Sequence, residues 1–401
     1  LMSKYVIKKT IKPFIRTLNI EGDKSLSIRW ALLASQAIGK SYAKNLLKSE
    51  DVLYTLRCLR KLGTKIKKKK DRYEIHGLGL NGYKFKNNII LDAGNSGTLS
   101  RLILGLLIHT KKKIRLIGDK SLSKRDFSRV TKPLELFGAK IKSNKNRLPV
   151  TIQGTSFVRP INYVENIGSA QIKTACCLGA LNAPGKTIIL ARKSRNHTEL
   201  LFKYLKIPIR VKSNKKFDLI EIDGLQQFNA FEYVIPGDIS SSSFFIVLTI
   251  LSKNSKLIIR KVNVNESRIG IVKILKMMNC KIFFKNKKIY NGEKIADIVV
   301  KSSKILKPIN CPSSLNSSAI DELLLIFLVA GTKAKGISKF NQLGELNKKE
   351  SPRLNIAIKF LRMIGIKVLR NKDNIKIYGN PKIELNGNYQ IKNFLKDHRI
   401  F

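Results

Sequence analysis

Clusters of small polar and cationic residues recur immediately before long apolar segments. The clusters are G-D-K-S from Gly22, G-N-S-G from Gly94, G-S-A-Q from Gly168, G-D-I-S from Gly237 and S-S-A-I-D from Ser317. Ser, Thr, Asp and Gly are common helix N-cap residues, so each cluster predicts the start of a helix. A helix N-terminus carries free N–H groups and about half a positive charge, and therefore attracts anions. Several such termini in one crevice would hold substrates with more than one phosphate or carboxylate.

Residues in these clusters, in G-D-K-S-L-S-K-R-D-F from Gly118, at a second helix start near Lys349 and near the C-terminus could bind anions and transfer protons. They are Lys24, Ser25, Arg29, Asn95, Gly97, Arg125, Ser169, Gln171, Asp321, Lys349, Glu350, Arg353 and Arg399. Taken singly, each is better explained as a helix cap or a solvated charge. Their recurrence at equivalent places in successive repeats favours a shared anion site instead.

Other motifs predict no chemistry. Gly77–Gly82 matches G-x-G-x-x-G but lacks the apolar helix that dinucleotide binding requires, and Gly185-Lys186-Thr187 lies between a helix and a strand, the reverse of a phosphate loop. The five cysteines show no C-x-x-C spacing and the four histidines are scattered, so we predict reduced core cysteines and no metal site.

The elements that must position the polar clusters form an internal repeat. A helix end, a Gly or a substitute for it, and then a strand recur at Gly63, Gly138, Lys206, Asn279 and Gly365, at intervals of 68 to 86 residues. Gly or Asn at this point is the left-handed cap that ends a helix, and Lys206 is the one departure. The helices after the polar clusters are apolar nearly all round, which predicts that they are buried.

Each repeat therefore holds two helices and several short strands, a unit of a mixed α/β fold. Five units are present, and residues 397–401 correspond to the beginning of a sixth. The repeat length predicts that about 40 residues are missing at the C-terminus, so that the chain is truncated there.

The composition is that of an ordinary globular protein, and 401 residues favour two domains. Lys and Arg number 78 against 27 Asp and Glu, for a net charge of +51. Such a charge attracts anions, including nucleic acid. Because the basic residues form no single stripe or tail, we prefer compositional drift as the explanation of the charge.

No targeting segment is visible in the sequence, and the longest apolar stretches are below the ~18 residues of a membrane span. The sequence predicts a cytoplasmic protein.

The polar clusters belong to longer motifs that closely resemble, in order from about Gly22 to the last residue, those of the 5-enolpyruvylshikimate-3-phosphate synthase family. The motifs are GDKSLSIRWALLASQA, GNSGTLSR, GDKSLSKRDFSRVTKPLELFGA, LPVTIQGT, SAQIKTACCLGAL, SRNHTE, PGDISSSSFF, AIDELLLIF, KKESPR and DHRI. The resemblance implies a two-domain inside-out α/β barrel of repeated βαβαββ units, with buried helices whose N-termini face the interdomain cleft. Domain one would comprise residues 1–22 and 237–401, and domain two residues 23–236.

The resemblance also implies a reaction, in which the 5-hydroxyl of 3-phosphoshikimate adds to phosphoenolpyruvate and phosphate is then lost. Asp321 would be the base near the hydroxyl, and Glu350 and Lys24 the acid and base around phosphoenolpyruvate. The implied contacts of 3-phosphoshikimate are Lys24, Ser25, Arg29, Ser169, Ala170, Gln171, Arg195, Asp321 and Lys349. Those of phosphoenolpyruvate are Lys24, Asn95, Gly97, Arg125, Gln171, Arg353 and Arg399. No metal or organic cofactor, nucleic acid or membrane is implied, and the enzyme would be a monomer.

The chain departs from the family pattern at three places. Ile28 and Trp30 give S-I-R-W in place of S-H-R-A, residues 265–270 replace N-P-T-R-T-G, and Pro352 replaces an Asp. With Ser351 as N-cap, Pro352 would fall at the first helical position, where a missing N–H costs nothing.

Two other functions remain open at this point. The related enolpyruvyl transferase that acts on UDP-N-acetylglucosamine generally carries a Cys on a mobile loop, but residues 118–130 contain none. A basic nucleic-acid-binding protein, or an RNA-end cyclase of related fold, would bind RNA with strong salt dependence.

Overall fold

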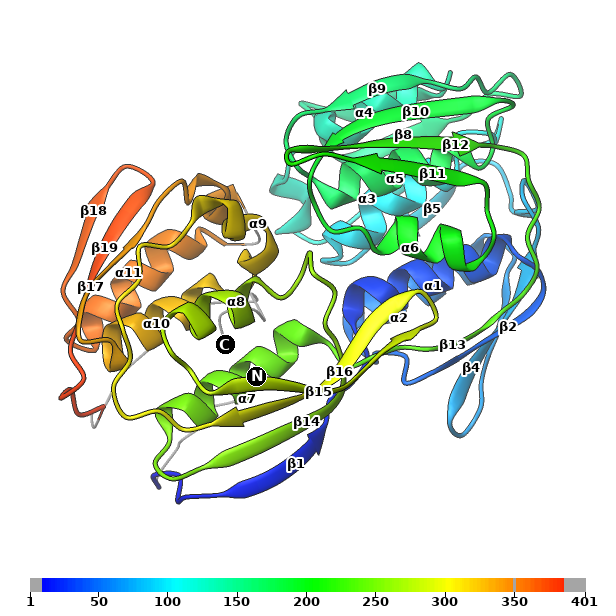
Figure 1. Cartoon of the computed structure of the whole chain (residues 1–401). Coiled ribbons are helices and arrows are strands. Elements are labelled where there is room, and N and C mark those ends of the chain that lie inside the picture. The colour runs from blue at the N-terminus through cyan, green and yellow to red at the C-terminus, as the bar shows by residue number, and fades with distance from the viewer. Residues whose placement is uncertain (1–8, 349–350, 386–401) are drawn as a thin grey trace. The chain divides into compact units, whose positions relative to one another are not determined.

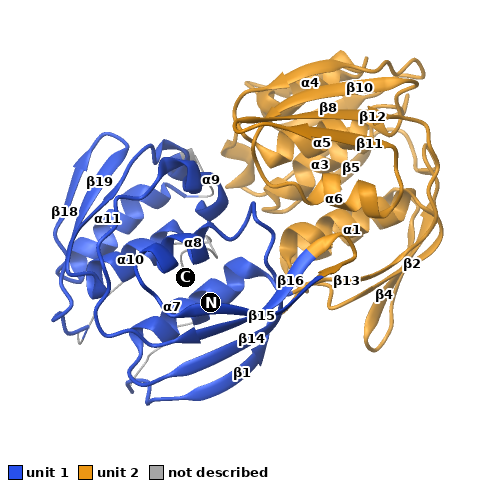
Figure 2. Cartoon of the chain, in the orientation of Figure 1, with its two compact units in different colours: residues 1–20, 237–288, 294–401 blue, residues 21–236, 289–293 orange. Residues whose placement is uncertain are grey.

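The computed structural model describes residues 9–348 and 351–385, whose elements are labelled in Figure 1. The contacts within the chain group it into two compact units, which are coloured separately in Figure 2. Unit 1 comprises Leu1–Ile20, Gly237–Lys288 and Lys294–Phe401. Unit 2 comprises Glu21–Pro236 and Ile289–Glu293.

This division differs from the expected one at residues 21–22 and 289–293, which belong to unit 2. Gly22 packs closely there, since a Cβ atom on Gly22 would lie 2.0 Å from the carbonyl oxygen of Asn45. Glu293 belongs to unit 2 because its carboxylate lies 2.6 Å from Nδ1 of His197. Both side chains of this pair are fully buried, which a repeat pattern read along the chain does not reveal.

Unit 2 contains three four-stranded sheets, each with a parallel pair at one edge followed by two antiparallel pairings. The first sheet has the order β13 (Glu232–Val234), β2 (Ile38–Lys44), β4 (Arg72–Leu78), β3 (Lys65–Lys68). The second has the order β5 (Ile89–Asp92), β6 (Lys113–Ile117), β8 (Arg147–Gln153), β7 (Lys140–Asn144). The third has the order β9 (Asn162–Glu165), β10 (Lys186–Arg192), β12 (Phe217–Asp223), β11 (Ile209–Ser213). In chain order, the second and third sheets with their helices each form a βαβαββ unit.

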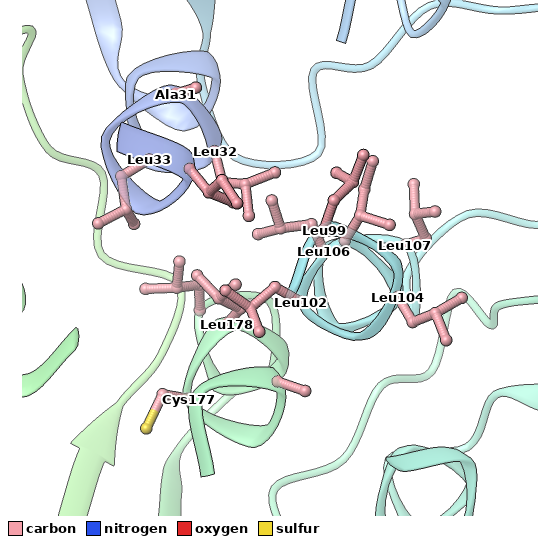
Figure 3. Packing of buried hydrophobic residues seen from close by; sticks show 14 of the residues in the cluster. Ala31, Leu32, Leu33, Leu99, Leu102, Leu104, Leu106, Leu107, Cys177 and Leu178 are labelled. Atoms are coloured by element: carbon pink, nitrogen blue, oxygen red, sulfur yellow. The ribbon is translucent and has the colours of Figure 1, made fainter. Parts of the chain in front are cut away.

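The helices of unit 2 are α1 (Lys24–Gln36), α2 (Glu50–Lys61), α3 (Gly97–Leu106), α4 (Ser128–Leu136), α5 (Ala170–Ala180) and α6 (His197–Tyr204), with a short 3-10 turn at Leu122–Lys124. Three of them, α1, α3 and α5, are buried over almost their whole length, as their all-round apolar sequences predict. Figure 3 shows these three helices presenting leucines to one another, among them Leu32, Leu102 and Leu178.

The backbones of α3 and α5 approach closely because Gly105 has no side chain. A Cβ atom at Gly105 would lie 2.2 Å from the carbonyl oxygen of Ala175. Leucines around this crossing fill the remaining space, so the helix starts at Gly97 and Ala170 are held in fixed relation.

Unit 1 contains a four-stranded sheet that also has a parallel pair at one edge, and a three-stranded antiparallel sheet. One sheet has the order β1 (Ile15–Asn19), β14 (Lys256–Asn263), β16 (Glu293–Lys301), β15 (Ile282–Tyr290). The other has the order β17 (Gly336–Phe340), β19 (Asn374–Gly379), β18 (Val368–Asn371). The helices are α7 (Ile239–Leu251), α8 (Gly270–Met277), α9 (Asn316–Ala319), α10 (Leu323–Lys333) and α11 (Arg353–Met363), with 3-10 turns at Ser313–Leu315 and Gly344–Lys348.

All five residues of the predicted helix caps adopt a left-handed backbone. The φ angles are 96° at Gly63, 107° at Gly138, 58° at Lys206, 69° at Asn279 and 89° at Gly365. A strand follows within one to three residues in every case. The repeat alignment is therefore confirmed even at Lys206, where the residue type opposes the conformation.

One predicted helix is wrong. The segment that begins near Ser317 does not form a single helix, because α9 ends at Ala319 and α10 begins at Leu323 after a bend of 118°. Within the described residues, no single helix is long and apolar enough to cross a membrane; this bent pair meets the length and composition requirement only when its two parts are taken together. The bend places Asp321 and Glu322 between two helices.

Candidate functional site

The start of α1 carries three of the candidate residues. The Asp23 side chain caps the helix by accepting a hydrogen bond from the backbone N–H of Leu26 at 2.9 Å. Lys24 follows as the first helical residue, and its ammonium lies 3.8 Å from Asp51. The Lys24 side chain is 15% exposed.

Arg29 is buried and fixed by two threonines and a carbonyl. Its Nε donates to Oγ1 of Thr198 at 2.9 Å, its Nη2 to Oγ1 of Thr174 at 3.0 Å, and its Nη1 to the Ser25 carbonyl at 3.1 Å. The Arg29 guanidinium therefore holds α1, α5 and α6 together.

Two guanidinium groups lie over the first residue of α3. A Cβ atom at Gly97 would lie 2.7 Å from Nη1 of Arg125 and 3.0 Å from Nη1 of Arg101. Arg125 is oriented by Asn95, whose Oδ1 accepts from its Nη2 at 2.8 Å. The helix terminus and the two guanidiniums together form a positive site suited to a phosphate or a carboxylate.

Arg101 is a candidate site residue that the sequence-based prediction missed. Its Nη1 donates to Oε1 of Gln171 at 3.0 Å, and Nε2 of Gln171 donates to Oγ1 of Thr98 at 3.2 Å. Arg101 therefore links the predicted residues of α3 and α5. A signal was available, because Arg101 ends the G-N-S-G-T-L-S-R motif, one helical turn after Gly97.

The remaining predicted residues of unit 2 lie at helix starts. Ser169 caps α5, since its Oγ accepts from the N–H of Ile172 at 3.4 Å, and Ala170 is the first helical residue. Arg195 is partly exposed and precedes α6 by two residues. Unit 2 thus brings Asn95 and Arg125 together near Gly97, and Arg101 joins Gly97 to Gln171. Ser169, Ala170 and Arg195 lie at or just before the starts of α5 and α6.

A buried ion pair and a buried hydrogen bond support the first turn of α6. The Lys173 ammonium lies 2.6 Å from the carboxylate of Glu199, and both side chains are buried. The imidazole of His197 pairs with the carboxylate of Glu293. Thr198, which lies between His197 and Glu199 in the sequence, accepts a hydrogen bond from Arg29. The three successive residues His197, Thr198 and Glu199 thus contact Glu293, Arg29 and Lys173. The position of Arg29 therefore depends on a helix turn that buried side-chain contacts hold in place.

In unit 1, Asp321 and Arg353 form an ion pair. Oδ1 of Asp321 lies 2.9 Å from Nη1 of Arg353, and the Arg353 side chain is 2% exposed. Asp321 retains more exposure, at 13%, so its carboxylate combines a fixed partner with access to solvent. Lys349, Glu350 and Arg399 lie outside the described residues.

Pro352 occupies a different helix position from the predicted one. It is the N-cap of α11, and Arg353 is the first helical residue. The Arg353 N–H bonds to the Ser351 carbonyl at 2.8 Å, so Ser351 contributes its backbone there, whereas we predicted it as the N-cap. Pro352 still needs no N–H partner at this place.

Two of the residues that depart from the family pattern, Ile28 and Trp30, are fully buried in α1 and are part of the core of unit 2. In the segment of residues 265–270, Arg268 matches the family pattern. It is 1% exposed, and its Nη2 lies 3.6 Å from Asp238. Within the described parts of the chain, no group of three His, Cys, Asp or Glu residues is placed to hold a metal ion.

Comparison with known proteins gives the family. The family model described as EPSP synthase (3-phosphoshikimate 1-carboxyvinyltransferase) matches residues 8–401. The chain belongs to this family. A 3-phosphoshikimate 1-carboxyvinyltransferase from Ruthia magnifica is 39% identical over 404 residues, covering 100% of this chain and 89% of the relative. Another from Petrotoga mobilis is 37% identical, covering 96% of this chain and 88% of the relative.

Solved structures agree with the EPSP synthase family. An EPSP synthase from Acinetobacter baumannii aligns with a TM-score of 0.82 and 34% identity, covering 92% of this chain and 83% of that chain. The mixed α/β fold of the two units is thus that of EPSP synthases. The comparisons support neither a UDP-N-acetylglucosamine enolpyruvyl transferase nor a nucleic-acid-binding protein.

Proposed function

We propose that this member of the EPSP synthase family transfers the enolpyruvyl group of phosphoenolpyruvate to the 5-hydroxyl of 3-phosphoshikimate and releases phosphate. The observation that carries this proposal is the family match over residues 8–401. The geometry adds a positive site over Gly97 and a carboxylate, Asp321, that is both partnered and accessible. The substrates together carry two phosphates and two carboxylates, which suits sites rich in Arg and Lys.

Phosphoenolpyruvate would bind through cations and one helix N-terminus. The proposed contacts are Lys24, Asn95, Gly97, Arg125, Gln171, Arg353 and Arg399. The two guanidiniums near Gly97 support this assignment, because paired N–H groups match the oxygens of a phosphate or a carboxylate. Arg101 would orient Gln171 and add charge to the same site.

3-Phosphoshikimate would bind at the starts of α1, α5 and α6 and near Asp321. The proposed contacts are Lys24, Ser25, Arg29, Ser169, Ala170, Gln171, Arg195, Asp321 and Lys349. Since three donors of Arg29 already bond to Ser25, Thr174 and Thr198, its contribution to binding is chiefly positive potential and positioning of Ser25.

The chemistry needs proton transfer at two places. Asp321 would accept the proton of the 5-hydroxyl, and the Arg353 guanidinium would favour the charged carboxylate that this requires. Lys24 and Glu350 would protonate the methylene carbon of phosphoenolpyruvate and later remove a proton from the methyl group. No metal or organic cofactor takes part in this scheme.

The wider organisation is proposed on the same basis. Residues 1–22 with 237–401 and residues 23–236 would form the two domains of an inside-out α/β barrel, with helix N-termini facing the cleft between them. The burial of α1, α3 and α5 beneath the sheets of unit 2 supports this arrangement. We further propose a cytoplasmic monomer.

The test is phosphate release from phosphoenolpyruvate with 3-phosphoshikimate, with UDP-N-acetylglucosamine, or with no acceptor. We expect release only with 3-phosphoshikimate, and Lys24→Met or Asp321→Ala should lower kcat by about 100-fold or more. Lys142→Met, which changes an exposed lysine of β7, is the matched control and should leave kcat unchanged. Release with UDP-N-acetylglucosamine alone would overturn the proposal.

A further inference from the structure

A buried polar chain joins the bend before α10 to the start of α7. The hydroxyl of Ser240 donates to the carboxylate of Glu322 and accepts from Nη2 of Arg268 at 2.9 Å. Nη2 of Arg268 also lies 3.6 Å from Asp238, the N-cap of α7. All four residues are at most 2% exposed, so the bonds between them act where water competes little.

Glu322 ends the bend in which Asp321 lies. Its backbone N–H bonds to the carbonyl of Ala319 at 2.9 Å, and its carbonyl accepts the first hydrogen bond of α10, from Ile326, at 3.1 Å. Glu322 is thus the N-cap residue of α10. The hydrogen bond from Ser240 to the Glu322 side chain therefore restricts the orientation of the peptide bond between Asp321 and Glu322.

Close packing holds the other end of the bend. A Cβ atom at Gly270, the first residue of α8, would lie 2.5 Å from Oγ of Ser318 and 2.7 Å from the N atom of Ala319. The end of α9 therefore rests directly on the backbone of α8. With Gly270 on one side and Glu322 on the other, the segment that carries Asp321 has little freedom to move.

We propose that Glu322 is a positioning residue, which through its buried bond to Ser240 holds Asp321 against Arg353. This inference rests on the proposed function, because only there is Asp321 the base for the 5-hydroxyl. These two adjacent residues make different contacts. Glu322 accepts a hydrogen bond from the buried Ser240, whereas Asp321 forms an ion pair with Arg353 and is partly exposed to solvent.

The first experiment compares kcat and KM of the full chain with those of Glu322→Ala and Glu322→Gln. In Glu322→Ala, kcat should fall by about 10- to 100-fold, since misplacement of a reacting group by about 1 Å has that effect, while KM for both substrates stays within about twofold. Glu322→Gln should keep kcat within about threefold of the wild-type value, because its amide oxygen can still accept the Ser240 hydroxyl. Unchanged kcat in Glu322→Ala, or equal loss in both variants, would overturn the proposal.

The control is Ser338→Ala, which removes another buried hydrogen bond of unit 1. Oγ of Ser338 accepts from the N–H of Ile309 at 3.2 Å, on β17 and away from the bend. This variant should lower the melting temperature as Glu322→Ala does, yet keep kcat within about twofold. Equal losses of kcat in the two variants would show that lost stability, and not positioning, explains the effect.

A measurement independent of activity separates this proposal from the proposed function. Asp321→Asn should lower the melting temperature in the wild-type chain, because it leaves the buried Arg353 without its carboxylate. The loss should be at least halved in the Glu322→Ala background, where the ion pair is already loosened. Equal losses in both backgrounds would overturn the positioning role, whether or not the wild-type chain releases phosphate.

Discussion

Burial keeps His109 neutral and thereby links the stability of the fold to pH. His109 follows α3, and burial lowers its pKa from 6.5 to about 4. In the unfolded chain the same imidazole takes up a proton near pH 6.5. Because the unfolded state binds that proton first as the pH falls, the free energy of unfolding should decrease from about pH 6.5 to pH 4 and then level off, by about 3 kcal/mol at most.

Urea unfolding of the wild type and of His109→Gln over this pH range measures the effect. The variant should lack the part of this decrease that His109 causes, so its free energy of unfolding should fall less than that of the wild type between about pH 6.5 and 4.5. Equal slopes for both proteins would show that His109 does not carry this dependence.

Glu74 provides the matched control at lower pH. Hydrogen bonds from His76 and Lys69 lower the pKa of Glu74 to about 2. Its stabilising effect is present above the ordinary pKa of about 4.5 and is lost as the pH falls towards 2, so Glu74→Gln should leave the slope above pH 4.5 unchanged.

The types of the site residues could be predicted from the sequence, but their partners could not. Lys24, Gly97 and Asp321 stand out because each lies at or near an expected helix start. The hydrogen bond from Arg101 to Gln171 joins residues 70 positions apart, and that from Arg29 to Thr198 joins residues 169 apart. No local pattern encodes such pairs, since they depend on how α3 and α5, or α1 and α6, pack together.

Among the elements, the helix cap at Lys206 is the strained member of the repeat. Its φ of 58° is left-handed, a conformation that costs a residue with a Cβ atom about 1–2 kcal/mol. The other caps avoid this cost with Gly, or reduce it with Asn279. The Lys206 side chain is exposed, so a substitution that removes it breaks no buried contact.

Lys206→Gly should therefore raise the free energy of unfolding by about 1 kcal/mol, less than the strain relieved, because Gly is also freer in the unfolded chain. Equilibrium urea unfolding provides the measurement. Lys203→Gly, at an exposed position within α6, is the matched control and should lower stability by about 0.5–1 kcal/mol. A Lys206→Gly protein less stable than the wild type would contradict the strain argument.

The repeat predicted helix caps and strand starts well because both depend on local chemistry. Gly63, Gly138 and Gly365 adopt the backbone that only Gly takes freely, and strands follow them. The prediction failed in the segment after Ser317, where apolar residues continue with a helical pattern through the bend. There Glu322 bonds to Ser240 and Asp321 pairs with Arg353, so contacts between distant segments override the local preference for a continuous helix.

At the scale of the whole molecule, the mixed α/β class and the family could be inferred from the order of the motifs. Each unit has its own hydrophobic core, one from Leu26 to Ile235 and the other from Ile239 to Ile377. The order of strands within each sheet could not be read from the repeat alone. It depends on which strand edges meet, as when β13 pairs with β2 across nearly the full length of unit 2.

The net charge of +51 raises the question of which anions the molecule binds. Basic residues occur in both units, for example at Lys65–Lys68 in β3 and Lys285–Lys288 in β15. Single-stranded RNA binding combines a cationic groove with stacked aromatic side chains. Of the exposed aromatic residues in the described part of the chain, Phe157, Tyr204 and Phe245 lie on separate segments, whereas Phe283 and Tyr290 share β15. A small anion needs only convergent donors, which Arg101 and Arg125 supply near Gly97.

We therefore expect 3-phosphoshikimate to bind with an affinity that falls as salt rises from about 0.05 M to 0.2 M, because exposed charges are screened over that range. A labelled single-stranded RNA should bind no tighter than about 1 μM at about 0.15 M salt, the level of non-specific association. Calorimetry measures the first affinity and fluorescence anisotropy the second, in the same buffers. Sub-micromolar RNA binding at that salt, together with no detectable binding of 3-phosphoshikimate, would reverse the order of the two functions and assign the positive charge to nucleic acid.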